Sequence, residues 1–149
     1  MRKVYIVRIL FIKTMSYIRK RITIISIAKP KQIDVNEELQ WMGDSLGLFH
    51  LRDKDKSCFR IFVEVIKAAK EDKPLSSDEI AEKTGITRGT AVHHLNKMME
   101  SGLILQQKNR YFLRDPNLEI LLEDLKRDFE TVYEELKKTA KEIDRMLGI

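Results

Sequence analysis

Small and hydrogen-bonding side chains are concentrated between residues 87 and 97, where the sequence reads TRGTAVHHLNK. At about 100° per residue, a helix here would carry a set of small or polar residues on one side: Gly89, Thr90, His93, Asn96 and Lys97. Their donors and acceptors match the groups that base pairs present in the major groove of DNA. A helix in this groove needs such residues in its first two turns, where it comes closest to the bases. The chemistry that this segment could perform is therefore hydrogen bonding to base edges.

Two short helices are predicted around this polar face. Ser76 and Glu79 have the spacing of a capping box, which predicts a helix that begins near Ser77. Gly85 suits the left-handed conformation that ends such a helix, and Thr87 suits the cap of the next one. The second helix has a single apolar side, formed by Ala91, Leu95 and Met98. The two helices and the tight turn between them predict a helix-turn-helix.

A short β-hairpin is predicted directly after the second helix. Ser101-Gly102 should end the helix, and two runs of strand-forming residues then flank the turn-forming pair Lys108-Asn109. The tip of the hairpin carries two positive charges, on Lys108 and Arg110. We therefore expect a wing over residues 103–114, whose tip lies on the phosphate backbone or in the minor groove of DNA.

These elements, with the motifs TRGTAVHHL from Thr87 and MMESGLI from Met98, resemble ArsR-like and MarR-like winged helix-turn-helix transcription regulators of the prokaryotic, archaeal type. The resemblance covers roughly residues 57–147. It implies sequence-specific binding of double-stranded DNA by a homodimer, with a recognition helix over about residues 87–100 in the major groove. The DNA contacts that it implies are Thr87, Arg88, Thr90, His93, His94 and Lys97, with Lys108 and Arg110 on the wing. His94 lies nearer the apolar side of the helix, so His93 is the better candidate for a base contact.

The C-terminal segment has a heptad repeat. Leu122, Phe129, Leu136 and Ile143 recur every seven residues, and the complementary positions are Leu125, Val132, Thr139 and Met146. A helix of about 30 residues is about 45 Å long, which exceeds the width of a small domain. We therefore expect a coiled-coil-like dimerisation helix with these interface residues: Leu122, Leu125, Phe129, Val132, Leu136, Ile143 and Met146. The alternative is a helix that folds back onto its own domain.

Two further helices are expected upstream of the helix-turn-helix. Residues 58–70 should form the first helix of the winged domain, with a core side made of Phe59, Phe62, Val63, Ile66 and Ala69. Residues 35–48 should form another helix, capped by Asp34 or Asn36. In the regulators that the chain resembles, a helix at this place commonly joins the dimer interface. The alternative is that it only covers the core.

Residues 1–31 contain nine Lys or Arg and no Asp or Glu among many β-branched apolar residues. Three interpretations remain open: a basic arm that binds DNA, a pair of added strands, or translated sequence upstream of a start at Met15. Arg8, Lys13 and residues 19–21 interrupt each apolar run before the ~20 residues that a membrane span needs, so no membrane span is expected. A membrane is not an expected partner, and a role at a membrane surface is the minor alternative. The segment also lacks the cleavage site of a secretory signal.

Catalytic and metal-binding patterns are weak. The chain contains one cysteine, Cys58, within an apolar helical segment, which indicates a buried thiol and a reducing cytoplasm. Asp53, Asp55 and Glu64 partly follow the spacing of a calcium loop, but Cys58 stands where that loop needs glycine. The paired thiols of metal-sensing ArsR-like repressors are absent from the second helix. We expect no enzyme activity, no metal and no cofactor, and leave open whether a small-molecule effector exists.

The sequence thus predicts a mainly α fold with a small β-hairpin wing. The expected parts are a basic N-terminal extension, a helix with its linker, the DNA-binding domain and the dimerisation helix: residues 1–31, 32–56, 57–115 and 116–149. A net charge of +5 permits binding to a polyanion without requiring it. The expected function is that of a homodimeric, sequence-specific transcription regulator. The alternative is a winged-helix module that binds protein within a transcription assembly or other macromolecular complex.

Overall fold

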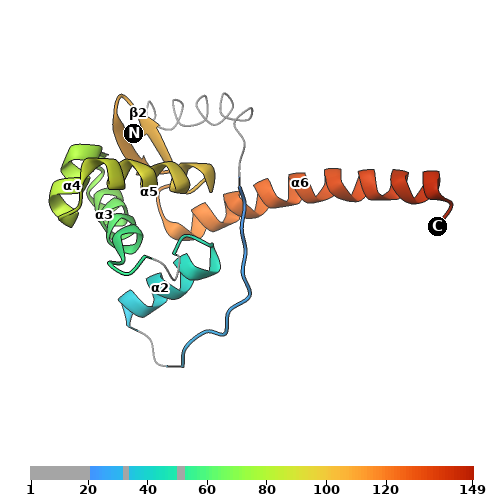
Figure 1. Cartoon of the computed structure of the whole chain (residues 1–149), viewed down its shortest axis with the longest axis horizontal. Helices are drawn as coiled ribbons and strands as arrows, with labels where there is room; N and C mark the ends of the chain where they lie inside the picture. The colour runs from blue at the N-terminus through green and yellow to red at the C-terminus, as the bar shows by residue number, and fades with distance from the viewer. Residues whose placement is uncertain (1–20, 32–33, 50–52) are drawn as a thin grey trace.

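The computed structural model describes residues 21–31, 34–49 and 53–149 of the chain (Figure 1). The elements in chain order are α2 (Val35–Ser45), α3 (Ser57–Glu71), β1 (Leu75–Ser76), α4 (Ser77–Thr84), α5 (Arg88–Glu100), β2 (Ile104–Gln107), β3 (Arg110–Leu113) and α6 (Leu118–Leu147). The fold is mainly helical with a small antiparallel wing and a long C-terminal helix, as the sequence predicts. Residues 1–20 lie outside the described residues. They include most of the basic extension and the alternative start at Met15.

The helix predicted over residues 58–70 is present as α3, but its buried side differs from the predicted one. Phe62 is buried as expected, whereas Phe59, Val63, Ile66 and Ala69 are only half-buried. The apolar residues that α3 buries are Cys58, Ile61, Phe62, Val65 and Ala68. The prediction was wrong because apolar residues occupy two adjacent sides of this helix, and its own periodicity does not choose between them.

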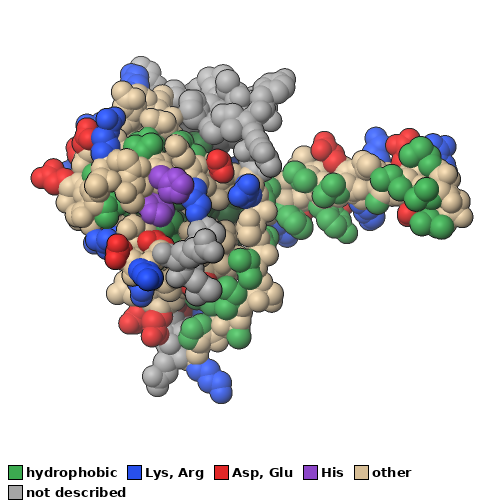
Figure 2. Space-filling view, viewed as in Figure 1, with side chains coloured by type: hydrophobic (Ala, Val, Ile, Leu, Met, Phe, Trp, Pro, Cys, Tyr) green, Lys and Arg blue, Asp and Glu red, His purple; other side chains and the backbone are tan. Residues whose placement is uncertain are grey.

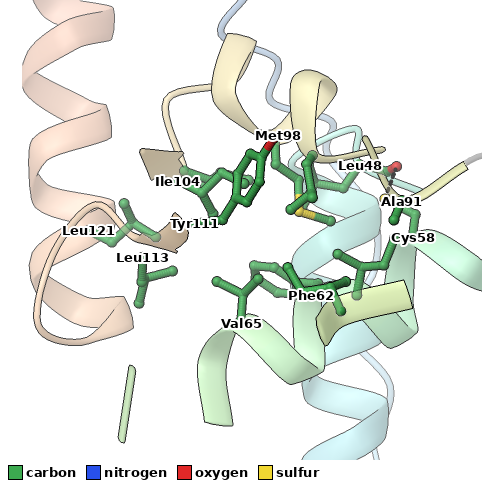
Figure 3. Close-up of a cluster of buried hydrophobic side chains, with 14 of the residues drawn as sticks. Leu48, Cys58, Phe62, Val65, Ala91, Met98, Ile104, Tyr111, Leu113 and Leu121 are labelled. Carbon is green, nitrogen blue, oxygen red and sulfur yellow. Dashed lines mark hydrogen bonds between the residues drawn. The ribbon is translucent and has the colours of Figure 1, made fainter. Parts of the chain in front are cut away.

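The core lies between α3, the second helix of the helix-turn-helix, the wing and the start of α6. Figure 3 shows Phe62 and Val65 of α3 gathered with Met98 of α5, Tyr111 of β3 and Leu121 of α6. Full burial of side chains of this size stabilises the fold by about 1.5–3 kcal/mol each. The apolar residues of α5, which the sequence predicts on one side, are all fully buried: Ala91, Leu95 and Met98. This burial fixes which side of α5 is left for solvent.

The helix-turn-helix forms as its capping residues predict. The Ser76 hydroxyl accepts from the Glu79 amide (3.2 Å), and the Glu79 carboxylate accepts from the Ser76 amide (2.7 Å). Gly85 ends α4 at a φ of 68°, a left-handed conformation that costs little without a Cβ. Arg60 of α3 also donates to the carbonyl of Thr84, the last residue of α4. The turn before α5 is thus fixed both by the Gly85 cap of α4 and by the hydrogen bond from α3.

The wing is part of a three-stranded antiparallel sheet in the order β1-β3-β2. Lys108 and Asn109 both have positive φ, 50° and 59°, which is the backbone of a two-residue type I′ hairpin. The hairpin was predicted, but β1 was not. In β1, Leu75 pairs with Tyr111 and Ser76 pairs with Arg110. A strand of two residues is too short to show any alternation in sequence.

The N-terminal part of the described chain crosses the domain in an extended conformation (Figure 1). The Arg21 amide donates to the carbonyl of Glu100 (2.8 Å), at the end of α5, and the Ile25 amide donates to the carbonyl of Ser45 (2.7 Å), at the end of α2. Residues 21–31 belong to neither a helix nor a strand, so this part of the extension adds no strand to the domain of its own chain. Asp34 caps α2 as predicted, although the helix ends at Ser45 rather than near residue 48.

The first turns of α6 pack on the domain, and the rest of the helix projects away from it (Figure 1). Leu121 is fully buried, and Leu125 is 6% exposed within the core of its own chain. Leu125, predicted as a dimer contact, is therefore a core residue of the monomer, because the helix has not yet left the domain at this point. Beyond it, every residue from Phe129 to the end of the chain is exposed. In the described residues, α6 therefore does not fold back onto its own domain, contrary to the alternative interpretation.

A buried arginine fixes the direction of α6. Arg114 follows β3, and its side chain is 6% exposed. Its guanidinium nitrogen Nη1 lies 2.6 Å from Oδ2 of Asp128 on α6 and 3.5 Å from the carbonyl of Gly102, which follows α5. One side chain thereby joins the wing, the end of α5 and α6.

No helix in the described part of the chain is long and apolar enough to cross a membrane.

Candidate nucleic-acid interface

One side of α5 and the turn before it form a polar surface. The exposed residues on this surface are Thr87, Arg88, Gly89, Thr90, His93 and Asn96. His94 and Lys97 are half-buried. The surface has two hydroxyls, an imidazole, an amide and a guanidinium, and no large hydrophobic side chain of α5 is exposed. These groups can hydrogen-bond to base edges and phosphates.

The hydroxyl of Thr87 has a structural role at the start of this surface. It accepts a hydrogen bond from the Thr90 amide (3.2 Å) and donates one to the Thr90 hydroxyl (2.9 Å). Capping therefore holds Thr87 and orients Thr90. Of the two threonines, Thr90 stands within the first turn of α5, where a helix in the major groove approaches the bases.

The two histidines of α5 lie beside each other at the surface, and Figure 2 shows them on the front of the domain. Their ring centroids are 5.5 Å apart and the rings meet edge to face. His93 is exposed, and His94 is half-buried nearer the apolar side, as the helical periodicity predicts. His93 therefore presents its ring nitrogens to a ligand more freely than His94 does.

Arg88, a predicted DNA contact, is held by the first turn of α4. Its Nε lies 3.3 Å from the Asp78 carboxylate and donates to the Ser77 hydroxyl, also at 3.3 Å. Both charged side chains are largely exposed, so water screens this ion pair and it adds little stability. The main consequence of this ion pair is that the Asp78 carboxylate lies beside Arg88, one of the cations expected to contact a phosphate.

The wing cation Arg110 has a similar acidic neighbour. Its Nη1 donates to the Glu79 carboxylate and to the carbonyl of Pro74, both at 2.9 Å. The hydrogen bond from the Ser76 amide, assisted by the charge of Arg110, holds the pKa of Glu79 below its usual value. Lys108 is exposed at the tip of the hairpin. Of the two wing cations, Arg110 thus fastens the wing to α4, whereas Lys108 is directed by the turn toward solvent.

Lys97 lies at the far end of the polar surface, near the extended N-terminal segment. It lines a small hollow together with Arg21 and Glu100. Its charge also acts on the Cys58 thiol, although burial is the dominant influence and raises the pKa of Cys58 to about 12. Lys97 is therefore set back from the first turns of α5, where Thr90 and His93 stand.

The residues that partly follow a calcium loop have another role. The two carboxylate oxygens of Asp53 accept from the backbone amides of Ser57 (3.2 Å) and Cys58 (2.9 Å), so Asp53 caps the start of α3. Among the described residues, no three His, Cys, Asp or Glu side chains lie close enough to hold a metal ion. The Cys58 thiol is buried and donates to the carbonyl of Leu48 (3.3 Å), as the dashed line in Figure 3 shows.

Comparison with known protein families agrees with this geometry. A family model described as a helix-turn-helix domain matches residues 55–107, which run from just before α3 to the end of β2. Residues 55–107 are an ArsR-like helix-turn-helix domain. Such a domain implies DNA-binding transcriptional regulation, and regulators of this family are typically not enzymes. No curated protein is similar enough to the chain to count as a match.

Sequence reasoning missed the acidic partners of the two arginines. Asp78 and Glu79 belong to the first turn of α4, where acidic residues are favoured by the helix dipole in any case. Arg88 and Arg110 lie 10 and 31 residues away from them along the chain. The one available signal was the capping box itself, because it fixes where the Glu79 carboxylate lies.

Proposed function

We propose that the chain is a homodimeric transcription regulator that binds double-stranded DNA with sequence specificity. In this proposal α5 enters the major groove, and the β2–β3 wing lies on the phosphate backbone or in the minor groove. Such a regulator would act in the cytoplasm. The observation that carries the proposal is the exposed side of α5, which is wholly polar or small and stands opposite a fully buried apolar side.

The residues proposed to contact DNA fall into two groups. Thr90, His93 and Asn96 are proposed to read base edges, because they are exposed on the side of α5 that faces away from the core. The proposed backbone contacts are Thr87, Arg88, Gly89, His94, Lys97, Lys108 and Arg110. An exposed lysine at the end of a narrow hairpin supports a phosphate contact for Lys108 in particular.

The proposed dimer forms through the free part of α6. Its heptad residues remain exposed in the monomer: Leu122, Phe129, Val132, Leu136, Ile143 and Met146. Phe129 is 43% exposed and Leu136 is 63% exposed, although both are large apolar residues. Figure 2 shows hydrophobic side chains along one side of the projecting helix. A continuous apolar side on a helix that has no neighbour among the described residues beyond its first turns supports pairing with a second copy.

Point variants on labelled duplexes test the proposed DNA contacts. His93→Ala should cost on the order of 1–3 kcal/mol on the preferred sequence and relax sequence preference, whereas Lys108→Ala should weaken all sequences alike and lower the salt slope by about 1. Lys137→Ala, on the exposed C-terminal half of α6, is the matched charge control and should change neither property. An equal loss on all sequences for His93→Ala would overturn the base contact. Binding to no duplex at all would favour a winged-helix module that binds protein.

A further inference from the structure

We propose that α6 pairs with α6 of a second copy in the antiparallel direction, so that the apolar tip of each helix fills a pocket at the foot of the other. The foot is defined as residues 122–129, and the tip as residues 146–149. This inference rests on the homodimer proposed above. It adds the direction of the pairing, its register and a site that is complete only when the second copy is present.

The pocket lies where α6 leaves the domain. It has a volume of about 120 Å³ and an almost entirely apolar lining. One wall is formed by Leu122, Lys126 and Phe129 of α6, and the other wall includes Ile22, Ile24 and Leu103 of the domain. Leu122 and Phe129 therefore belong both to this pocket and to the exposed heptad side of the helix. The pocket is a continuation of the proposed dimer interface.

The tip of the helix has the complementary apolar character. Met146 is 71% exposed, Leu147 68% and Ile149 87%, so three apolar side chains at and just after the end of α6 lie in water. In a parallel dimer the two pockets would face each other, and the two apolar tips would face each other. In an antiparallel dimer each apolar tip would enter the apolar pocket of the other copy. This arrangement would remove more apolar surface from water than the parallel one.

The heptad repeat permits this arrangement in one register. When Phe129 lies opposite Met146 of the second copy, Val132 lies opposite Ile143 and Leu136 lies opposite Thr139, so the repeat is matched over its whole free length. Sliding the second helix seven residues toward the domain would set its Ile143 against Leu125, which is already buried in its own core. Sliding it seven residues the other way would leave the foot uncovered.

The same register carries the tip to the pocket. It sets Leu147, the last residue of α6 in the second copy, opposite Asp128, and Ile149 follows the Gly148 cap beside Lys126, which lines the pocket wall. In this register the two Lys126 positions of the dimer are separated along the helix axis by on the order of 30–35 Å at the helical spacing.

Disulfide cross-linking of the full chain tests the direction and the register. Lys126→Cys and Ile149→Cys variants are mixed, oxidised and separated by mass; the native Cys58 is buried and does not compete. We expect a cross-linked species that joins the two different variants, and little cross-linking of either variant alone. The control is Glu123→Cys, outside the heptad side of α6, which should not cross-link with Ile149→Cys.

Two results would overturn the proposal in different ways. Cross-linking of each variant with itself, without the mixed species, would show a parallel dimer; the homodimer would stand and the pocket assignment would fail. A monomer in sedimentation at micromolar concentration would overturn the homodimer as well. DNA binding of the unmodified chain, measured in parallel, separates both results from failure of the DNA-binding function.

Discussion

Replacing Asp128 with asparagine should weaken the fold much more than its position on a largely exposed helix suggests. Asp128 lies 2.6 Å from Arg114, whose side chain is 6% exposed. The asparagine keeps an acceptor oxygen but removes the negative charge, so among the described residues the only carboxylate left beside the buried guanidinium is that of Asp115, 4.0 Å from its Nε. The predicted effect is a loss of folding free energy at neutral pH.

The structure gives the size of this loss. Removing one partner of a fully buried ion pair costs about 3–5 kcal/mol. The Asp128 side chain is 19% exposed, the asparagine retains a hydrogen bond, and the Asp115 carboxylate stays near Arg114, so we expect a smaller loss of about 2–3 kcal/mol. For a chain of this size the urea midpoint should then fall by about 1 M.

Urea unfolding followed by circular dichroism measures this loss, at one protein concentration because a dimer is stabilised by mass action. The matched control is Asp124→Asn, one turn earlier on α6, which removes an ion pair of 2.8 Å with the exposed Arg127. This control should cost less than about 1 kcal/mol. Equal small losses for both variants would refute the argument that the buried Arg114 depends on Asp128.

Three further predictions concern single titratable groups. Because burial raises the pKa of Cys58 to about 12, the folded chain should resist alkylation at pH 8 while the urea-unfolded chain reacts; equal rates would contradict the buried position. The pKa of Glu79 is lowered from its ordinary 4.5, chiefly by the hydrogen bond from the Ser76 amide, so its stabilising contribution is present above pH 4.5 and is lost as the pH falls through the lowered value. Glu79→Gln should therefore flatten the stability profile in that range, measured by thermal unfolding, and an unchanged profile would refute this role. Asp78→Asn should raise affinity for DNA by up to about fivefold at low salt, because it removes the acidic neighbour of Arg88, and an unchanged affinity in a titration would mean that Arg88 does not approach a phosphate.

The helix-turn-helix could be predicted from the sequence because its signals are local. Ser76 with Glu79, Gly85 and Thr87 each determine the backbone of their own helix end through contacts within three or four residues. The hairpin is similar, because Lys108 and Asn109 can adopt the positive φ of a two-residue turn by themselves. These elements account for most of the candidate DNA-binding surface.

The remaining features depend on neighbours that are distant in sequence. The buried side of α3 was mispredicted because the choice between Ile61 and Val63 is made by the elements that pack on the helix. The point where α6 leaves the domain depends on the contact between Arg114 and Asp128. The heptad pattern is the same before and after this point, so the sequence does not indicate where it lies. The same reasoning explains why Leu125 was assigned to the dimer although it belongs to the core.

Selection of bound fragments from genomic DNA, using the purified chain, tests the central claim most directly. We predict recovery of a two-fold motif that is bound at least about 10³-fold more tightly than random duplex at the same salt concentration. The affinity for both should fall with salt, since phosphate contacts contribute to each. Recovered fragments without a common motif, bound no more tightly than random duplex, would contradict sequence-specific binding through α5.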